Sequence, residues 1–152
     1  MGRIKIKLDI IVYVILGIAL FLCTITDLKY QKIYLSVIAA DMLLLTGYHI
    51  WQNSFFAVDI AGVIAVGVVF GVVCIASGNK IGSGDVLLFM LTGLGLGVYA
   101  NIFIIMISFL GTFFVAVFLV TVMHKSKNYR MPLAPFILFS FIVYVASITR
   151  LK

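Results

Sequence analysis

Two aspartates in this sequence stand where a long apolar run meets a short polar segment. Asp27 follows the apolar stretch 10–26, and Asp85 begins another apolar stretch. A carboxylate beside a membrane helix is costly to keep there, which favours a functional role. Two such groups brought together share a proton, so the ionised one can take a proton from water while the other hydrogen-bonds a substrate carbonyl. The pair predicts aspartic hydrolase chemistry, which needs neither a metal nor a serine.

A glycine-rich turn, Gly82-Ser83-Gly84, directly precedes the second aspartate. Because glycine has no Cβ, the backbone of Gly82 and Gly84 can adopt a positive φ and an extended peptide can come close to it. A protease needs such access, since a helical substrate hides its scissile bonds. We therefore expect Gly82, Ser83 and Gly84 to form a substrate-binding loop. The alternative for either aspartate is a structural role, in which it caps a helix or meets a lysine at the membrane interface.

The composition indicates an integral membrane protein. Of the 152 residues, 64% are hydrophobic and 11% are charged, and the mean hydropathy of +1.29 lies outside the range of soluble domains. The formal charge of +6 could suggest nucleic acid, but the basic residues lie in short segments between apolar runs, as charges that flank membrane spans do. We expect membrane lipid as a partner and no nucleic acid. Cys and His residues show no metal-ligand spacing, so no metal and no cofactor are predicted.

The apolar runs predict an all-α integral membrane fold, a bundle of six transmembrane helices that forms a single domain over residues 1–152. The predicted spans are about 10–26, 33–51, 57–76, from 86, from 102, and from 131 to near 149. The fourth and fifth must be separate, because the 38 uncharged residues from Val86 to Met123 would make one helix about 57 Å long, nearly twice the hydrocarbon core. The expected hinge is Gly97 to Asn101.

This connectivity places both aspartates on one membrane face. Two spans separate Asp27 from Asp85, and an even number returns the chain to the same side. Six basic residues are expected on that side and five on the other. The six lie in loops between spans, whereas the five are terminal, which favours a cytoplasmic position for the aspartates.

Three segments carry motifs in a characteristic order. Residues 82–86 read Gly-x-Gly-Asp followed by a hydrophobic residue. Residues 27–33 begin Asp-hydrophobic, continue through polar and basic residues and return with Ile, and Pro132 and Pro135 open the last apolar run as Pro-x-x-Pro-hydrophobic. Together, over nearly the whole chain, they resemble the type IV prepilin peptidase family, the membrane aspartic proteases with a GxGD motif.

The resemblance implies a single transmembrane peptidase domain in which Asp27 and Asp85 are the catalytic pair. It implies that residues 82–84 form the active-site loop and that Pro132 and Pro135 are structural. The implied substrate is a prepilin or pseudopilin, whose basic leader is removed at the cytoplasmic side of its hydrophobic helix. The implied location is a bacterial-type cytoplasmic membrane, with the active site facing the cytoplasm.

The sequence departs from the family pattern at three positions. Tyr34 and Leu35 stand where members commonly have Pro-Asn, and Leu87 stands where they often have Lys. These changes leave both aspartates intact and bear on substrate contacts. Larger, bifunctional members add a cytoplasmic segment with paired cysteines that is linked to N-methylation of the product. The sequence has no such segment, so we expect cleavage without methyl transfer.

A non-enzymatic alternative is a six-helix carrier or assembly factor in which Asp27, Asp41 and Asp85 form a proton or cation path. A carrier would more usually show broken helices or two repeated halves, and no half-chain repeat is visible. Asp41 lies about eight residues into its span, hence about 12 Å below the interface, and must be neutral or hydrogen-bonded there. Structural and functional roles are both open for it. Asp59 is expected at the interface.

Overall fold

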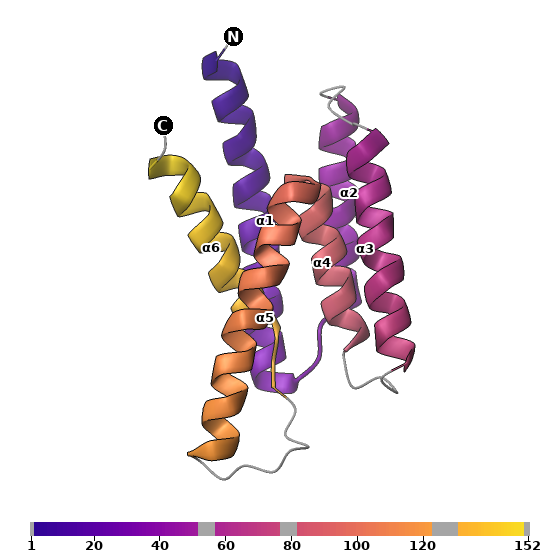
Figure 1. Cartoon of the computed structure of the whole chain (residues 1–152). Coiled ribbons are helices and arrows are strands. Elements are labelled where there is room, and N and C mark those ends of the chain that lie inside the picture. Colours follow the sequence, from indigo (N-terminus) through magenta and orange to yellow (C-terminus); the bar gives the residue numbers. More distant parts are fainter. Residues whose placement is uncertain (1, 52–56, 77–81, 123–130, 151–152) are drawn as a thin grey trace.

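The chain folds into a bundle of helices (Figure 1). The computed structural model describes residues 2–51, 57–76, 82–122 and 131–150, with the side chains of residues 2–9 and 57–59 left undescribed. Within these residues the helices are α1 (Gly2–Tyr30), α2 (Leu35–Trp51), α3 (Ala57–Ala76), α4 (Ser83–Leu96), α5 (Val98–Thr121) and α6 (Ala134–Arg150). The prediction of an all-α fold with six helices is therefore confirmed.

Two of these helices meet the length and hydropathy expected of a membrane span. They are Ile10–Tyr30 of α1 and Val98–Thr121 of α5, and the other helices in the described ranges are shorter and apolar. The shortest, α4, has 14 residues, or about 21 Å of helix, against a hydrocarbon core of about 30 Å.

The predicted boundaries differ from the observed ones mainly where the chain turns. α4 begins at Ser83, inside the glycine-rich turn, and α6 begins at Ala134, after Pro132. The break between α4 and α5 is the single residue Gly97, whose φ of 82° suits glycine far better than a residue with a side chain. α5 therefore begins at Val98, and the hinge predicted to reach Asn101 is four residues too long at its C-terminal side.

α4 lies at the centre of the bundle. It packs against α1, α2, α3 and α5, while α6 packs against α1 and α5. Figure 1 shows that the N-terminus of α1 and the C-terminus of α6 lie at the upper end of the bundle. The C-terminus of α1 and the N-termini of α2, α4 and α6 lie toward the opposite end, which carries both aspartates. We call this the Asp end.

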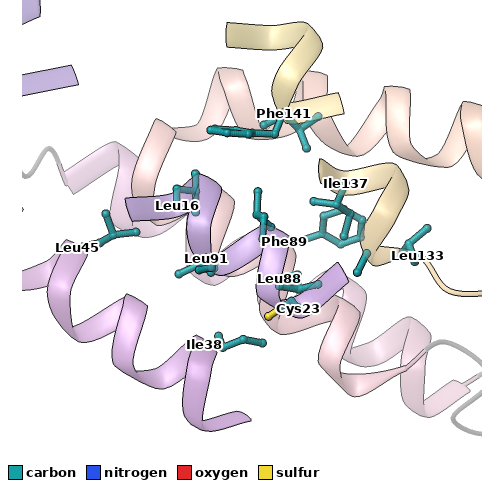
Figure 2. Packing of buried hydrophobic residues seen from close by; sticks show 14 of the residues in the cluster. Leu16, Cys23, Ile38, Leu45, Leu88, Phe89, Leu91, Leu133, Ile137 and Phe141 are labelled. Atoms are coloured by element: carbon teal, nitrogen blue, oxygen red, sulfur yellow. The ribbon is translucent and has the colours of Figure 1, made fainter. Parts of the chain in front are cut away.

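The buried core joins α1, α2, α4 and α6 (Figure 2). Leu16 and Leu20 of α1 are fully buried, as are Leu88 and Leu91 of α4. Figure 2 shows side chains from α1, α2, α4 and α6 that point into one cluster. Its labelled members are Leu16, Cys23, Ile38, Leu45, Leu88, Phe89, Leu91, Leu133, Ile137 and Phe141. This packing fixes how α1, α4 and α6 approach one another at the Asp end.

Two glycines of α3 allow close helix packing, as expected of small residues in membrane helices. A Cβ added at Gly62 would collide with Val98, and one added at Gly67 would lie 2.7 Å from the sulfur of Met90. Gly71 has open space beside it, with no atom within 4 Å. The missing side chains of Gly62 and Gly67 therefore make room for neighbouring helices, whereas Gly71 makes no such contact among the described residues.

Hydrogen bonds between buried polar side chains join neighbouring helices. Asn101 of α5, 1% exposed, donates from Nδ2 to the carbonyl of Phe89 at 2.9 Å and accepts from the Thr92 hydroxyl at 2.7 Å. Ser108 of α5 and Ser140 of α6 lie 3.1 Å apart through their hydroxyls. These contacts join α4 to α5 and α5 to α6. Asn101 is therefore a buried residue of α5 that holds α4, and it is not part of a hinge.

The segments 52–56, 77–81 and 123–130, which fall between predicted spans, lie outside the described residues, together with their basic side chains. The same holds for the side chain of Asp59.

Candidate active site

Three segments that are distant in sequence meet at a pocket of about 500 Å³ at the Asp end. They are the end of α1 with the residues that follow it, the start of α4, and the residues that lead into α6. The lining residues are Asp27, Gln31, Lys32, Ile33, Gly82, Ser83, Gly84, Asp85, Met131, Pro132 and Leu133. The three segments are those singled out by their motifs in the sequence, and they enclose one space.

Asp27 lies in the last turn of α1 and is 7% exposed. Its Oδ2 accepts a hydrogen bond of 3.1 Å from the backbone N–H of Ala134, the first residue of α6. The backbone of Leu133 also hydrogen-bonds this carboxylate. The first N–H groups of a helix have no partner within it, so the start of α6 is a natural donor to an anion. The contact joins residues 107 positions apart and fixes the carboxylate of Asp27 in place.

The proline segment supplies this donor. Pro132 lines the pocket, and α6 begins two residues later. Pro135, which lacks an N–H, occupies the first turn of α6, where a helix tolerates proline. Because Ala134 is the first residue of α6, its N–H has no partner within the helix and can bond Asp27. Pro132 contacts the pocket directly, whereas Pro135 belongs to the helix start.

Asp85 occupies the first turn of α4. Its backbone N–H donates to the carbonyl of Gly82 at 3.0 Å, and the backbone of Gly82 hydrogen-bonds its carboxylate. Asp85 therefore reaches back to the N-cap residue of its own helix, as in a capping box. The structural alternative from the sequence analysis, a helix cap, describes this local geometry, and the same carboxylate also lines the pocket.

The glycine-rich turn does not adopt the backbone conformation that we expected. Gly82 has φ −64° and ψ 133°, an extended conformation open to any residue, and Gly84 is inside α4. Among the residues that the structure describes, Gly97 is the glycine with positive φ. The space beside Gly84 is also occupied, because a Cβ there would lie 2.8 Å from the Cβ of Ile33. Gly84 thus allows close packing within the protein.

The two aspartates share one pocket. Asp27 and Asp85 line the same pocket, and the charge of Asp27 acts on Asp85. The structure therefore confirms that both aspartates lie at one end of the bundle, as the count of intervening spans predicts. Two close carboxylates in a poorly solvated site titrate as a pair and hold one proton between them. Such a pair can activate a water molecule and polarise a carbonyl group.

The fifth helix extends beyond the fourth at the Asp end. α4 and α5 meet at Gly97 and run in opposite directions (Figure 1). Since α5 has 24 residues and α4 has 14, α5 extends about 15 Å farther toward the Asp end. Asp85, at the start of α4, therefore lies nearer the middle of the bundle than the C-terminal end of α5 does.

A comparison of the chain with models of known protein families found a match. The model of the type IV leader peptidase family matches residues 14–120, which include both aspartates and the glycine-rich turn. The chain belongs to this family. No curated protein and no solved structure matched the chain.

Membership in the type IV leader peptidase family implies an aspartic-type endopeptidase that acts on prepilins. Members of the family are membrane proteins, in agreement with the apolar helices of this chain. The matched range ends before Pro132, so the role of α6 at the site rests on the structure. Tyr34 and Leu35, which replace the common Pro-Asn, are both exposed beside the start of α2.

Several pocket residues were not assigned to the site from the sequence, although three of them lie within the motif segments. Gln31 and Lys32 line the pocket, and so do Met131 and Leu133. Gln31 adopts φ 50°, which is unusual for a residue with a side chain. The residue type at position 134 does not reveal the backbone donor, because every non-proline residue has an N–H.

Asp41 lies outside the pocket. It is 5% exposed on the inner side of α2, between Ile38 and Leu45. Its Oδ2 has no hydrogen-bond partner among the residues that the structure describes. Cys23 of α1 lies within electrostatic range of both Asp41 and Asp27. Among the described side chains, no three His, Cys, Asp or Glu residues gather closely enough to hold a metal ion.

Proposed function

We propose that this protein is a membrane-embedded aspartic endopeptidase that removes the basic leader from a prepilin or pseudopilin at the cytoplasmic membrane face. The observation that carries the proposal is the meeting of Asp27 and Asp85, two residues distant in sequence but both within the matched range, in one pocket. In this proposal all six helices lie in the membrane and form a single peptidase domain. The leader is removed without methyl transfer.

The proposed mechanism uses the two carboxylates and one proton. The ionised aspartate takes a proton from a water molecule, which attacks the carbonyl carbon of the scissile peptide. The protonated aspartate hydrogen-bonds the carbonyl oxygen and stabilises the negative charge that develops there. Collapse of the tetrahedral intermediate then needs a proton on the leaving nitrogen, and the pair can supply it. Backbone donors hold both groups, which supports their role as a fixed pair.

The roles of the two aspartates follow from their donors. Asp27 accepts from the backbone groups of Ala134 and Leu133, whereas among the described residues the Asp85 carboxylate accepts from one backbone group, that of Gly82. An N–H donor bonds an ionised oxygen more strongly than a neutral one, so the aspartate with more donors is the better ionised partner. We assign Asp27 as the group that takes the proton from water and Asp85 as the group that donates to the carbonyl.

A pocket at one end of a bundle of apolar helices suits a substrate that is itself membrane-bound. A prepilin carries its cleavage site next to an apolar helix, so the scissile peptide has to be reached near the membrane surface. At the Asp end, α5 extends beyond the start of α4, and many of its apolar side chains are exposed. Lys32, an exposed basic residue, also lines the pocket.

The carrier alternative has less support. A proton or cation path across the bilayer needs groups distributed along its length. Asp27 and Asp85 lie together at one end, and Asp41 lies outside their pocket.

The test is reconstitution with a precursor that carries a basic leader, a glycine and an apolar helix. The parent protein should release the leader, as shown by the mass of both products, and the double variant Asp27→Asn/Asp85→Asn should release none. An inserted and folded parent protein that leaves such precursors intact would contradict the proposal. Cleavage by the double variant would show that another group carries the reaction.

A further inference from the structure

The segment after α1 packs directly on the start of α4, and this contact joins the two chain segments that carry the aspartates. Ile33 lies six residues after Asp27, and Gly84 immediately precedes Asp85. A Cβ added at Gly84 would lie 2.8 Å from the Cβ of Ile33, 3.0 Å from its Cδ1 and 3.3 Å from its Cγ1. Ile33 therefore covers the face of α4 that glycine leaves bare, beside the pocket.

The backbone before Ile33 is held in an unusual conformation. Gln31 has φ 50°, the one positive φ outside glycine in the described residues. Its N–H donates to the carbonyl of Asp27 at 2.9 Å. Residues with side chains keep this conformation when the surrounding structure enforces it, and such residues concentrate at functional sites. The turn at Gln31 reverses the chain after α1 and brings Ile33 onto α4.

We propose that Ile33 and Gly84 are positioning residues that set the distance between the carboxylates of Asp27 and Asp85. The effect on the cleavage rate rests on the proposed function. The effect on the distance between the two aspartates rests on the packing alone. The Cβ of Ile33 is attached to the backbone, so a clash there cannot be relieved by rotating the side chain. Any group added at Gly84 has to move one of the two segments.

The size of the movement follows from the contact distance. An ordinary carbon contact begins near 3.4 Å, so a methyl group at Gly84 must move about 0.6 Å away from the Ile33 Cβ. Misplacement of a catalytic group by about 1 Å can cost about 100-fold in rate. The Gly84→Ala variant should therefore cleave at least about 10-fold more slowly, through kcat, while the chain still inserts.

The first test is a double-variant cycle on the cleavage rate of a reconstituted precursor. Gly84→Ala is measured with Ile33, with Ile33→Ala and with Ile33→Gly. Ile33→Ala removes the Cγ1 and Cδ1 contacts and keeps the closest one, and Ile33→Gly removes all three. The loss caused by Gly84→Ala should fall from about 10-fold or more to less than about 3-fold with Ile33→Gly, and take an intermediate value with Ile33→Ala.

A matched control is available in α3. Gly71 is also a helical glycine, and its missing Cβ faces open space. Gly71→Ala should keep the parental rate. An equal loss from Gly84→Ala in all three Ile33 backgrounds would overturn the proposal, and so would a parental rate for Gly84→Ala.

The second test reads the distance without using activity. Cys23 and Cys74 are replaced by Ala, Asp27 and Asp85 are replaced by Cys, and the pair is linked in membranes by bifunctional thiol reagents of increasing length. Gly84→Ala should lower the yield with the shortest effective reagent, and added Ile33→Gly should restore it. An unchanged yield would overturn the positioning role. Because this chain has no catalytic aspartates, a shifted yield supports the positioning role even if no precursor is ever cleaved.

Discussion

Lengthening the side chain of Asp27 by one methylene tests how closely its position is set. The Asp27→Glu variant keeps a carboxyl group and its charge but moves it about 1.5 Å farther from the backbone of α1. The Ala134 N–H bond of 3.1 Å to Oδ2 is then lost or badly bent. Since Asp27 is 7% exposed, the longer group has little room to bend back.

Two independent estimates give a similar loss. Loss of a hydrogen bond to a charged group costs about 1.5–3 kcal/mol, which corresponds to about 10- to 150-fold in rate if the bond is needed in the transition state. A displacement of about 1 Å also costs about 100-fold. We therefore expect kcat for precursor cleavage to fall by about 100-fold, with a smaller change in KM.

The assay is single-turnover cleavage of a reconstituted precursor at matched amounts of folded protein. Asp41→Glu is the control, because it adds the same methylene at a buried aspartate outside the pocket. It should cost stability through overpacking and little activity. A rate for Asp27→Glu above one tenth of the parental rate would refute the reasoning that the start of α6 fixes this carboxylate.

Three further predictions concern Ala134, Asn101 and Ser83. Ala134→Pro removes the N–H donor to Asp27 and places the ring against the carboxylate, so cleavage should fall by about 10-fold or more in the reconstituted assay, whereas Ala134→Gly keeps the donor and should retain most activity. Asn101→Ala removes two buried hydrogen bonds between α4 and α5 and should lower the free energy of unfolding in a detergent titration by about 1–3 kcal/mol; a parental value would contradict the role given to this contact. Ser83 is exposed at the edge of the pocket, so Ser83→Ala should change the cleavage rate by less than about 3-fold, and a larger loss would indicate a contact with substrate.

The helices were predictable from the sequence because apolar runs and the residues that interrupt them are local signals. The segment 57–76 was predicted with the same limits as α3. The separation of α4 from α5 followed from length alone, since 38 uncharged residues cannot cross a bilayer once. The hinge was placed too widely because Asn101 is polar, and local polarity does not reveal that the side chain is buried against the Phe89 carbonyl.

The aspartate pair was also predictable, because the number of spans between Asp27 and Asp85 determines that they share an end of the bundle. The groups that hold the pair were not. The donor to Asp27 is a backbone N–H 107 residues away, and no side-chain pattern encodes such a contact. The glycine-rich turn was interpreted as open to substrate, since the sequence shows the missing Cβ of Gly84 and not the Ile33 side chain that covers it.

The most direct test of the central claim is the cleavage rate of the Asp27→Asn and Asp85→Asn variants, with Asp41→Asn as the buried control. An amide can neither take a proton from water nor share one, and loss of general acid–base catalysis costs about 100- to 10,000-fold. Each of the two pocket variants should insert, keep the parental thermal stability within a few degrees and lose cleavage by that factor, while Asp41→Asn should cleave the precursor. Substantial cleavage by either Asp27→Asn or Asp85→Asn in membranes would contradict the account of a catalytic aspartate pair.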